Sequence, residues 1–320
     1  MSASNQHALE PVPKLFFEPL IKTALESALS HVLAEQFDYH QAVDLAKQDS
    51  YCLTPLSGTH PVWRCQVGPH QFIIKICQGH SAAAFSVQST YQLQQRLYQQ
   101  DLAAKPYYLA PLNAHQTLWI EQYVAAAFDH ADSTNPIQPL CDSLWRLHQQ
   151  AIDPTLRQVD PLEQAQRLFT QLKIKCETGT VQEPSFIFEL ETRLAALTNK
   201  FTADANGMIA EPSASHTFNA SNTANTANLP VLCHNDLQIE HVRAAGVMID
   251  WEYAGAGSRY YDLVNCILIN ELDTNEQAAL IQTYADISAI PQETVQVQCE
   301  RYLPLAHLIN TLWHCLIDKQ

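Results

Sequence analysis

The sequence lacks the features that define several special classes of protein. Its nine cysteines include no CxxC pair and are odd in number, so we interpret them as reduced thiols in apolar strands and helices. No apolar run approaches the roughly 18 residues of a membrane helix. Residues 1–13 also lack the basic and then apolar pattern of a signal peptide. We therefore expect a cytoplasmic protein without a membrane span.

Basic side chains are also scarce. The chain has 18 Lys and Arg against 33 Asp and Glu, which gives a formal net charge of -15. This charge repels polyanions, so we expect no nucleic-acid partner and no affinity for anionic membranes. It is compatible with a cationic substrate. A chain of 320 residues with 47% hydrophobic content is long enough for two connected cores, so a two-lobed globular protein is predicted.

The hydrophobic pattern changes period along the first third of the chain. Short runs in which apolar and polar residues alternate, separated by segments with Gly and Pro, predict an antiparallel meander. A later apolar run predicts a buried strand. Helix-period segments flank the meander. The predicted strands are residues 51–56, 62–67, 72–77 and 117–124, and the predicted helices are residues 16–47 and 82–100.

The rest of the chain has a mainly helical pattern, so the fold class is α+β. A short apolar run at residues 229–233 leads into a polar segment, and residues 241–249 predict a hairpin around Ala244-Ala245-Gly246. Residues 202–228 have few large apolar side chains and predict a mobile insertion loop. Helices are predicted at residues 139–150, 161–175, 184–201, 261–270, 276–286 and 294–317.

Two aspartates follow predicted strands in the last third. Asp236 and Asp250 lie 14 residues apart. Because each follows a predicted strand, both carboxylates are expected at one rim of a sheet. Such a pair can divide the work of phosphoryl transfer: one carboxylate orients or deprotonates a hydroxyl group, and the other holds Mg²⁺ against the phosphates.

The motifs around these aspartates resemble those of a known superfamily. CHNDL followed by IDWEYAG is similar to the paired signature of choline, ethanolamine and thiamine kinases and of aminoglycoside phosphotransferases. The segments LSGTHPVWRCQV, FIIKI, LWIEQYV, LWRLH and YYDL occur in the same order as in that superfamily. The resemblance implies a bilobal, protein kinase-like fold, with an N-terminal lobe at residues 1–123 and a helical C-terminal lobe at residues 124–320.

The resemblance also implies roles for individual residues. Asp236 matches the catalytic base or hydroxyl-orienting residue, and Asp250 the principal metal ligand. Lys75 matches the lysine that contacts the α- and β-phosphates of ATP. His234 and Asp262 match residues that support the catalytic loop. Contacts with the nucleotide are implied for Ser57 and Gly58 in a phosphate turn, and for backbone groups of Glu121 and Tyr123 at the hinge between the lobes.

Two positions depart from the superfamily pattern. Its usual asparagine, five residues after the catalytic aspartate, is His241 here. Three interpretations stay open: the imidazole binds a softer metal such as Mn²⁺, an oxygen of Glu240 or Gln238 substitutes for that of the asparagine, or the second metal is absent and activity is reduced. The helix expected to supply a glutamate partner for Lys75 has no acidic residue, so Gln88 or Gln92 is the expected neutral partner. These departures keep open the alternative of a pseudokinase that binds a nucleotide without turnover.

Aromatic residues near Asp250 indicate the substrate class. Trp251, Glu252 and Tyr253 follow it directly, and Trp313 is a candidate second wall, although an aromatic at this helix spacing is also typical of a core. Aromatic faces beside a carboxylate suit a cation. The predicted function is thus ATP- and Mg²⁺-dependent phosphorylation of a small cationic alcohol such as choline, ethanolamine or thiamine, with an amino sugar as the alternative acceptor.

Overall fold

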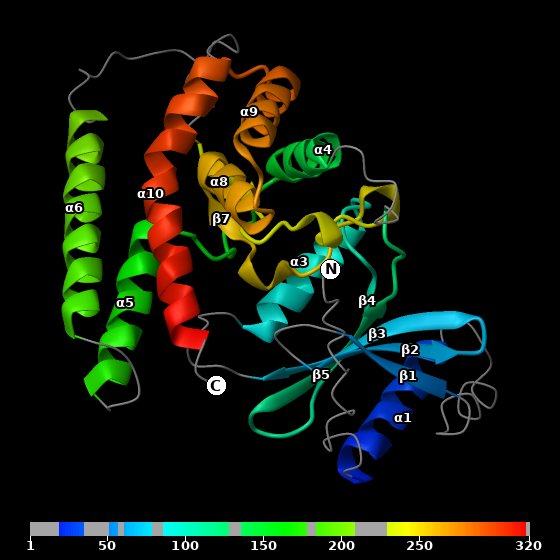
Figure 1. The fold of residues 1–320 in the computed structure, drawn as a ribbon. Helices are drawn as coiled ribbons and strands as arrows, with labels where there is room; N and C mark the ends of the chain where they lie inside the picture. Colours follow the sequence, from blue (N-terminus) through cyan, green and yellow to red (C-terminus); the bar gives the residue numbers. More distant parts are fainter. Residues whose placement is uncertain are drawn as a thin grey trace, which may run out of the picture. The chain divides into compact units, whose positions relative to one another are not determined.

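The computed structural model describes residues 19–34, 51–56, 61–78, 86–127, 136–177, 184–208 and 229–317. The chain divides into two compact units, Met1–Ala125 (unit 1) and Ala126–Gln320 (unit 2). Unit 1 contains a five-stranded sheet and unit 2 most of the helices, which confirms the predicted α+β class (Figure 1).

Unit 1 is built on a five-stranded antiparallel sheet with the order β1-β2-β3-β5-β4 (Figure 1). The four predicted strands are present, and β4 is an addition. The sequence of β4, PYYLAP, begins and ends with proline and therefore resembles a loop. Proline is tolerated there because β4 is an edge strand, where fewer ladder bonds are required. The strands are β1 (Tyr51–Leu56), β2 (Val62–Val67), β3 (His70–Gln78), β4 (Pro106–Pro111) and β5 (Gln116–Gln122).

The core of unit 1 joins helix α1 (Pro19–Leu33) to one face of this sheet. The shared apolar residues follow a helical spacing in α1 and alternate along β2, β3 and β5, as their sequences predict. Of the predicted 16–47 helix, residues 16–18 and 35–50 lie outside the described residues. The buried cluster consists of Leu25, Ala28, Leu29, Val32, Leu33, Cys65, Val67, Phe72, Ile74, Leu118 and Ile120.

The opposite face of the sheet is covered by helix α3 (Val87–Tyr98). Side chains alternate along a strand, so Lys75, Trp119 and Glu121 point away from the α1 core. Tyr91 of α3 lies edge-on to Trp119, with ring centroids 5.3 Å apart. This second face therefore carries polar residues that α3 buries.

Unit 2 is a group of helices in which α10 is central. It contacts α5, α6, α8 and α9, while α4 contacts α9 (Figure 1). The six predicted helices are present. No described helix has the length and hydropathy needed to cross a membrane. The helices are α4 (Ile137–His148), α5 (Pro161–Glu177), α6 (Pro184–Met208), α8 (Arg259–Ile269), α9 (Thr274–Ser288) and α10 (Gln292–Ile317).

Helix α6 is longer than predicted. It continues to Met208, so residues 202–208 are helical and the predicted insertion loop is wrong over this part. The prediction relied on a lack of large apolar side chains, but alanine-containing segments form helix turns without them. Residues 209–228 lie outside the described residues.

A small two-stranded sheet carries the segment with both aspartates. Strand β6 (Val231–Cys233) pairs with β7 (Gly255–Gly257), which was not predicted. Between them, the predicted hairpin is reduced to a single antiparallel bridge, Val242 to Met248. Short 3-10 turns at Ile239–His241 and Ala244–Gly246 replace regular strands around that bridge.

Gly255 allows a loop to approach β7 closely. The Ala256 N–H donates to the Arg157 carbonyl at 2.8 Å, and the Val159 N–H donates to the Ala256 carbonyl at 2.7 Å. A Cβ at Gly255 would lie 2.6 Å from the Val159 side chain and 2.8 Å from the Arg157 carbonyl oxygen. The pairing therefore requires a residue without a side chain at Gly255.

We expect Gly255→Ala to destabilise unit 2 by about 2 kcal/mol, because the added methyl group forces the backbone apart. Thermal melting of Gly255→Ala and of a matched control, Gly257→Ala, checks this. A Cβ at Gly257 would meet its nearest atom at 3.2 Å, so its effect should be smaller. Equal melting temperatures for the two variants would contradict the proposed close approach.

Candidate active site

One buried carboxylate holds the backbone of the loop that carries Asp236. Asp262, at the start of α8, is fully buried. Its Oδ2 accepts the His234 N–H at 2.9 Å, and its Oδ1 accepts the Asn235 N–H at 2.6 Å. Asn235 has a positive φ of 62°, a conformation that asparagine tolerates better than most residues. These two bonds set the direction in which the chain enters Asp236.

A buried relay extends from Asp262 to α4 and α9. His148 Nε2 lies 3.1 Å from Asp262 Oδ2, and His148 Nδ1 lies 2.6 Å from the Tyr284 hydroxyl oxygen. Burial lowers the pKa of His148, so the ring is neutral. Nε2–H then donates to Asp262, and Nδ1 accepts from Tyr284. Sequence reasoning missed His148 and Tyr284, although His148 ends the LWRLH motif.

Asn270, at the end of α8, fixes the other side of the loop. Its Nδ2 donates to the Leu237 carbonyl at 2.9 Å, and its Oδ1 accepts the Ile239 N–H at 2.8 Å. Sequence reasoning also missed this residue, because a single asparagine at a helix end is typical of ordinary caps. The loop is thus bonded to both ends of α8.

His234 and Trp251 are interior residues. Burial lowers the pKa of His234 to about 4, so its neutral ring donates from Nε2 to the Ile249 carbonyl at 2.9 Å. Trp251 is 2% exposed, and its ring centroid is 4.7 Å from that of His234. The predicted substrate contact of Trp251 is therefore corrected: a 3-10 turn at Trp251–Tyr253 directs this indole into the core.

Asp236, His241 and Asp250 converge. Each offers a ligand atom, and these atoms lie within 4.8 Å of one another. His241 Nδ1 is 2.7 Å from the Asp236 carbonyl oxygen, which only accepts, so Nδ1 carries a proton. His241 Nε2 faces Asp250 Oδ2 at 3.7 Å. The nitrogen that makes no bond to the backbone is thus the one closer to this carboxylate.

Asp236 has an unusual affinity for a proton. Burial, followed by the charges of Asp250 and Glu252, raises the pKa of Asp236 to about 8. Asp250 itself has the left-handed conformation, with φ 69° and ψ 60°. Three carboxylates thus gather on one short segment, and the field favours a cation or a proton there.

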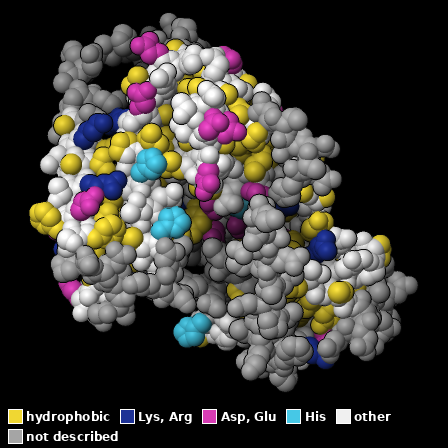
Figure 2. Space-filling model, viewed as in Figure 1, with side chains coloured by type: hydrophobic (Ala, Val, Ile, Leu, Met, Phe, Trp, Pro, Cys, Tyr) yellow, Lys and Arg dark blue, Asp and Glu magenta, His cyan; other side chains and the backbone are white. Residues whose placement is uncertain are grey.

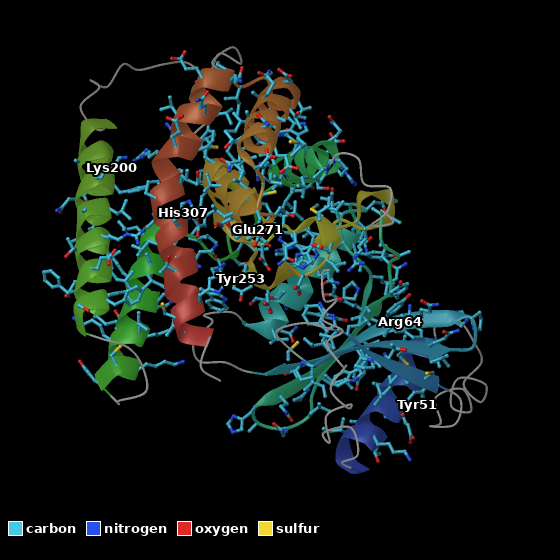
Figure 3. All side chains as sticks on the ribbon, viewed as in Figure 1. Tyr51, Arg64, Lys200, Tyr253, Glu271 and His307 are labelled. Carbon is cyan, nitrogen blue, oxygen red and sulfur yellow. The ribbon has the colours of Figure 1, made fainter. Side chains whose placement is uncertain are left out.

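Tyr253 and Trp313 form an aromatic corner beside these carboxylates. Their rings are nearly perpendicular, with an interplanar angle of 88° and centroids 5.9 Å apart. Figure 3 shows Tyr253 beside the C-terminal part of α10, which carries Trp313. Burial raises the pKa of Tyr253, and the charges of Glu252, Asp236 and Asp250 raise it further. The Tyr253 hydroxyl donates to Glu252.

The predicted nucleotide residues belong to unit 1. Lys75 Nζ lies 3.1 Å from Glu121 Oε1, so this lysine has an acidic partner on β5 in addition to any contact with Gln88 or Gln92 of α3. Tyr123 donates its N–H to the Gln71 carbonyl at 3.4 Å. Ser57 and Gly58 lie outside the described residues.

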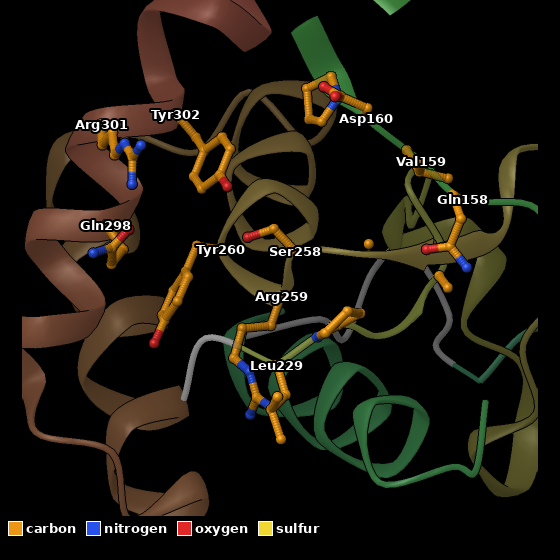
Figure 4. A pocket seen from close by; sticks show the side chains of 14 residues that line it. Gln158, Val159, Asp160, Leu229, Ser258, Arg259, Tyr260, Gln298, Arg301 and Tyr302 are labelled. Carbon is orange, nitrogen blue, oxygen red and sulfur yellow. The ribbon is translucent and has the colours of Figure 1, made fainter. Parts of the chain in front are cut away.

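Unit 2 also contains a cavity of about 410 Å³ that includes none of the predicted site residues. It lies between the loop before α5, the start of α8 and one side of α10 (Figure 4). Ser258, Tyr260, Arg301 and Tyr302 contribute polar groups to its wall.

Acidic side chains are visible at several separate places over unit 2 (Figure 2).

Known structures share this fold. A choline kinase from Cryptosporidium parvum has a TM-score of 0.66 and 10% identity, with 91% of this chain and 90% of that chain covered. A Plasmodium vivax ethanolamine kinase has a TM-score of 0.62 and 15% identity, with 91% and 81% covered. An aminoglycoside phosphotransferase from Streptomyces rimosus, in complex with ADP and streptomycin, has a TM-score of 0.52 and 15% identity, with 89% and 98% covered.

These likenesses define a kinase-like fold, and they confirm the fold predicted from the motifs. The sequence model of the phosphotransferase enzyme family matches residues 53–294, and the chain belongs to this family. The matched range includes Lys75, Asp236 and Asp250. A search of the curated proteins found no match.

We expect Asp236→Asn to stabilise the protein in the absence of metal and nucleotide. The folded pKa of about 8 exceeds the unfolded value of 3.8, so the folded state binds the proton more tightly and loses stability as pH rises from 4 to 8. At pH 8 the variant should melt at least about 2 °C higher, which corresponds to ~1 kcal/mol in a domain of this size. The difference should shrink progressively toward pH 5.

Thermal melting across this pH range, with a chelator present, checks the expectation. Asp142→Asn removes an exposed carboxylate from the same unit and serves as the matched control. A difference for Asp236→Asn that does not change with pH would contradict a buried charge as its cause.

Proposed function

We propose that this family member is an ATP-dependent kinase that phosphorylates the hydroxyl group of a small cationic alcohol of the choline, ethanolamine or thiamine type. The observation that carries the proposal is the nearly perpendicular Tyr253–Trp313 pair, with ring centroids 5.9 Å apart, in which Tyr253 feels the charges of Glu252, Asp236 and Asp250. Ring faces and carboxylates attract a cation, while an uncharged alcohol gains little from either. The choline and ethanolamine kinases of similar fold support this substrate class.

Asp236 is the proposed base or hydroxyl-orienting group. A base works best when its pKa is close to the operating pH, and that of Asp236 is raised to about 8. The Asp262 carboxylate holds the preceding backbone, so the Asp236 side chain has a fixed origin. A bound hydroxyl therefore meets a positioned oxygen with a high affinity for its proton.

Asp250 and His241 are the proposed holders of a divalent cation. When bound, such an ion offsets the negative charge of the nucleotide phosphates. Two features of the site fit it: the convergent carboxylates, and the His241 Nε2 that faces Asp250 Oδ2 at 3.7 Å. The Nδ1–H bond to a backbone carbonyl is typical of metal-binding histidines. Mg²⁺ is the expected ion, and the imidazole favours Mn²⁺ over it.

Turnover tests the proposal directly. We expect ATP consumption that depends on choline, ethanolamine or thiamine and that is lost in Asp236→Ala. Trp313→Leu should raise the KM for the cationic acceptor about tenfold, with a smaller change in kcat, because one ring wall is removed. Steady-state kinetics with Mg²⁺ and with Mn²⁺ measures both effects.

The matched control is Phe188→Leu, which changes a 70% exposed aromatic of the same unit. Equal KM values for Trp313→Leu and the wild type would remove Trp313 from the acceptor site. Turnover only with amino sugars would favour the alternative acceptor. Nucleotide binding without turnover of any acceptor would favour a pseudokinase.

We expect His241→Asn to reduce Mn²⁺ affinity about tenfold while Mg²⁺ affinity changes little, because nitrogen ligands favour Mn²⁺ more than Mg²⁺. Calorimetric titration of each metal into the nucleotide-free protein measures this without reference to activity. Exposed His307→Asn in α10 is the control. Unchanged Mn²⁺ affinity would exclude His241 as a ligand.

A further inference from the structure

Lys75 has a buried acidic partner that lies on the sheet. Glu121 is on β5, two residues beyond Trp119, which is directly opposite Lys75 in the β3–β5 register. Side chains in this diagonal relation share a face of the sheet, and long ones can meet. The Lys75 Nζ to Glu121 Oε1 distance is 3.1 Å, with side-chain exposures of 16% and 3%.

The adjacent helix contributes an amide to this pair. Gln94 of α3 is 2% exposed, and its Nε2 donates to Glu121 Oε2 at 2.8 Å and to the Ala104 carbonyl at 3.0 Å. Both Nε2 protons of Gln94 are thereby used. Each oxygen of the Glu121 carboxylate has its own donor, which a buried carboxylate requires. The carboxylate is therefore held in one orientation relative to Lys75.

We propose that Glu121 is the positioning residue of Lys75, with Gln94 orienting its carboxylate, so that the phosphate-contacting lysine is anchored within the sheet. The inference rests on the proposed function, in which Lys75 contacts the nucleotide. Helix α3 carries no Asp or Glu. The described part of unit 1 has only two other acidic residues, Glu26 and Asp101, and neither is on β3 or β5.

A sheet anchor has a mechanical consequence. The positions of Lys75 and Glu121 are fixed by the ladder between β3 and β5, which is continuous from Phe72 to Gln78. A shift of α3 would remove the Gln94 amide but would leave the ion pair in place. Lysine orientation is thus a property of the folded sheet, and it exists before a nucleotide binds.

A double-mutant cycle tests this inference, with binding of a fluorescent ADP derivative to the full chain as the measurement. We expect Glu121→Gln to weaken binding about tenfold, because it removes the charge that orients the lysine and leaves the shape unchanged. In a Lys75→Met background, the same substitution should change affinity less than about twofold. Glu26→Gln, which removes a carboxylate from the same unit, should leave affinity unchanged.

Each result separates the inference from the proposed function. A loss of affinity in Lys75→Met with no effect of Glu121→Gln, or with equal effects in both backgrounds, would overturn the positioning role and keep the nucleotide site. Unchanged affinity in Lys75→Met would overturn the nucleotide role of Lys75 and the inference with it. If Glu121→Gln does not fold by circular dichroism, Gln94→Met decides: a Lys75-dependent loss of affinity supports the inference, and unchanged affinity contradicts it.

Discussion

The hydrogen bonds from two consecutive backbone N–H groups to Asp262 are the constraint on which the rest of the site depends. A fully buried carboxylate is stable only when its oxygens have donors, and here His234 N–H, Asn235 N–H and the neutral His148 ring supply them. Satisfying this one anion forces Asn235 into a left-handed conformation and turns the chain toward the cluster of Asp236, His241 and Asp250. The position of Asp236 is thus a consequence of burying a different acid.

The site concentrates negative charge at a cost to stability. Burial raises the pKa of Asp236 most, and the charges of Asp250 and Glu252 raise it further. Carboxylates at such short range disfavour one another's charged forms, and groups with strongly shifted pKa values gather at functional sites.

Much of the fold followed from hydrophobic periodicity, because apolar residues alternate along the buried strands and recur at helical spacing in the helices. Strands β4 and β7 did not, since prolines bound the first and glycines make up most of the second. The site was harder to predict than the fold. Trp251 and Tyr253 both lie within three residues of Asp250 in sequence, but one 3-10 turn directs the indole inward and the phenol toward Trp313.

The two departures from the superfamily pattern also show that the contacts of a site are harder to predict from sequence than the fold. The missing acid in α3 suggested Gln88 or Gln92 as the partner of Lys75, whereas the β3–β5 register brings Glu121 to this lysine. His241 left open whether a metal ligand was kept, replaced or lost, and its Nδ1–H bond to a backbone carbonyl leaves Nε2 at 3.7 Å from Asp250. Each departure is accompanied by a group of suitable chemistry nearby, so neither one by itself favours an inactive protein. The sequence shows which of the superfamily's side chains are absent. Only the folded structure shows which other side chains lie near Lys75 and Asp250 instead.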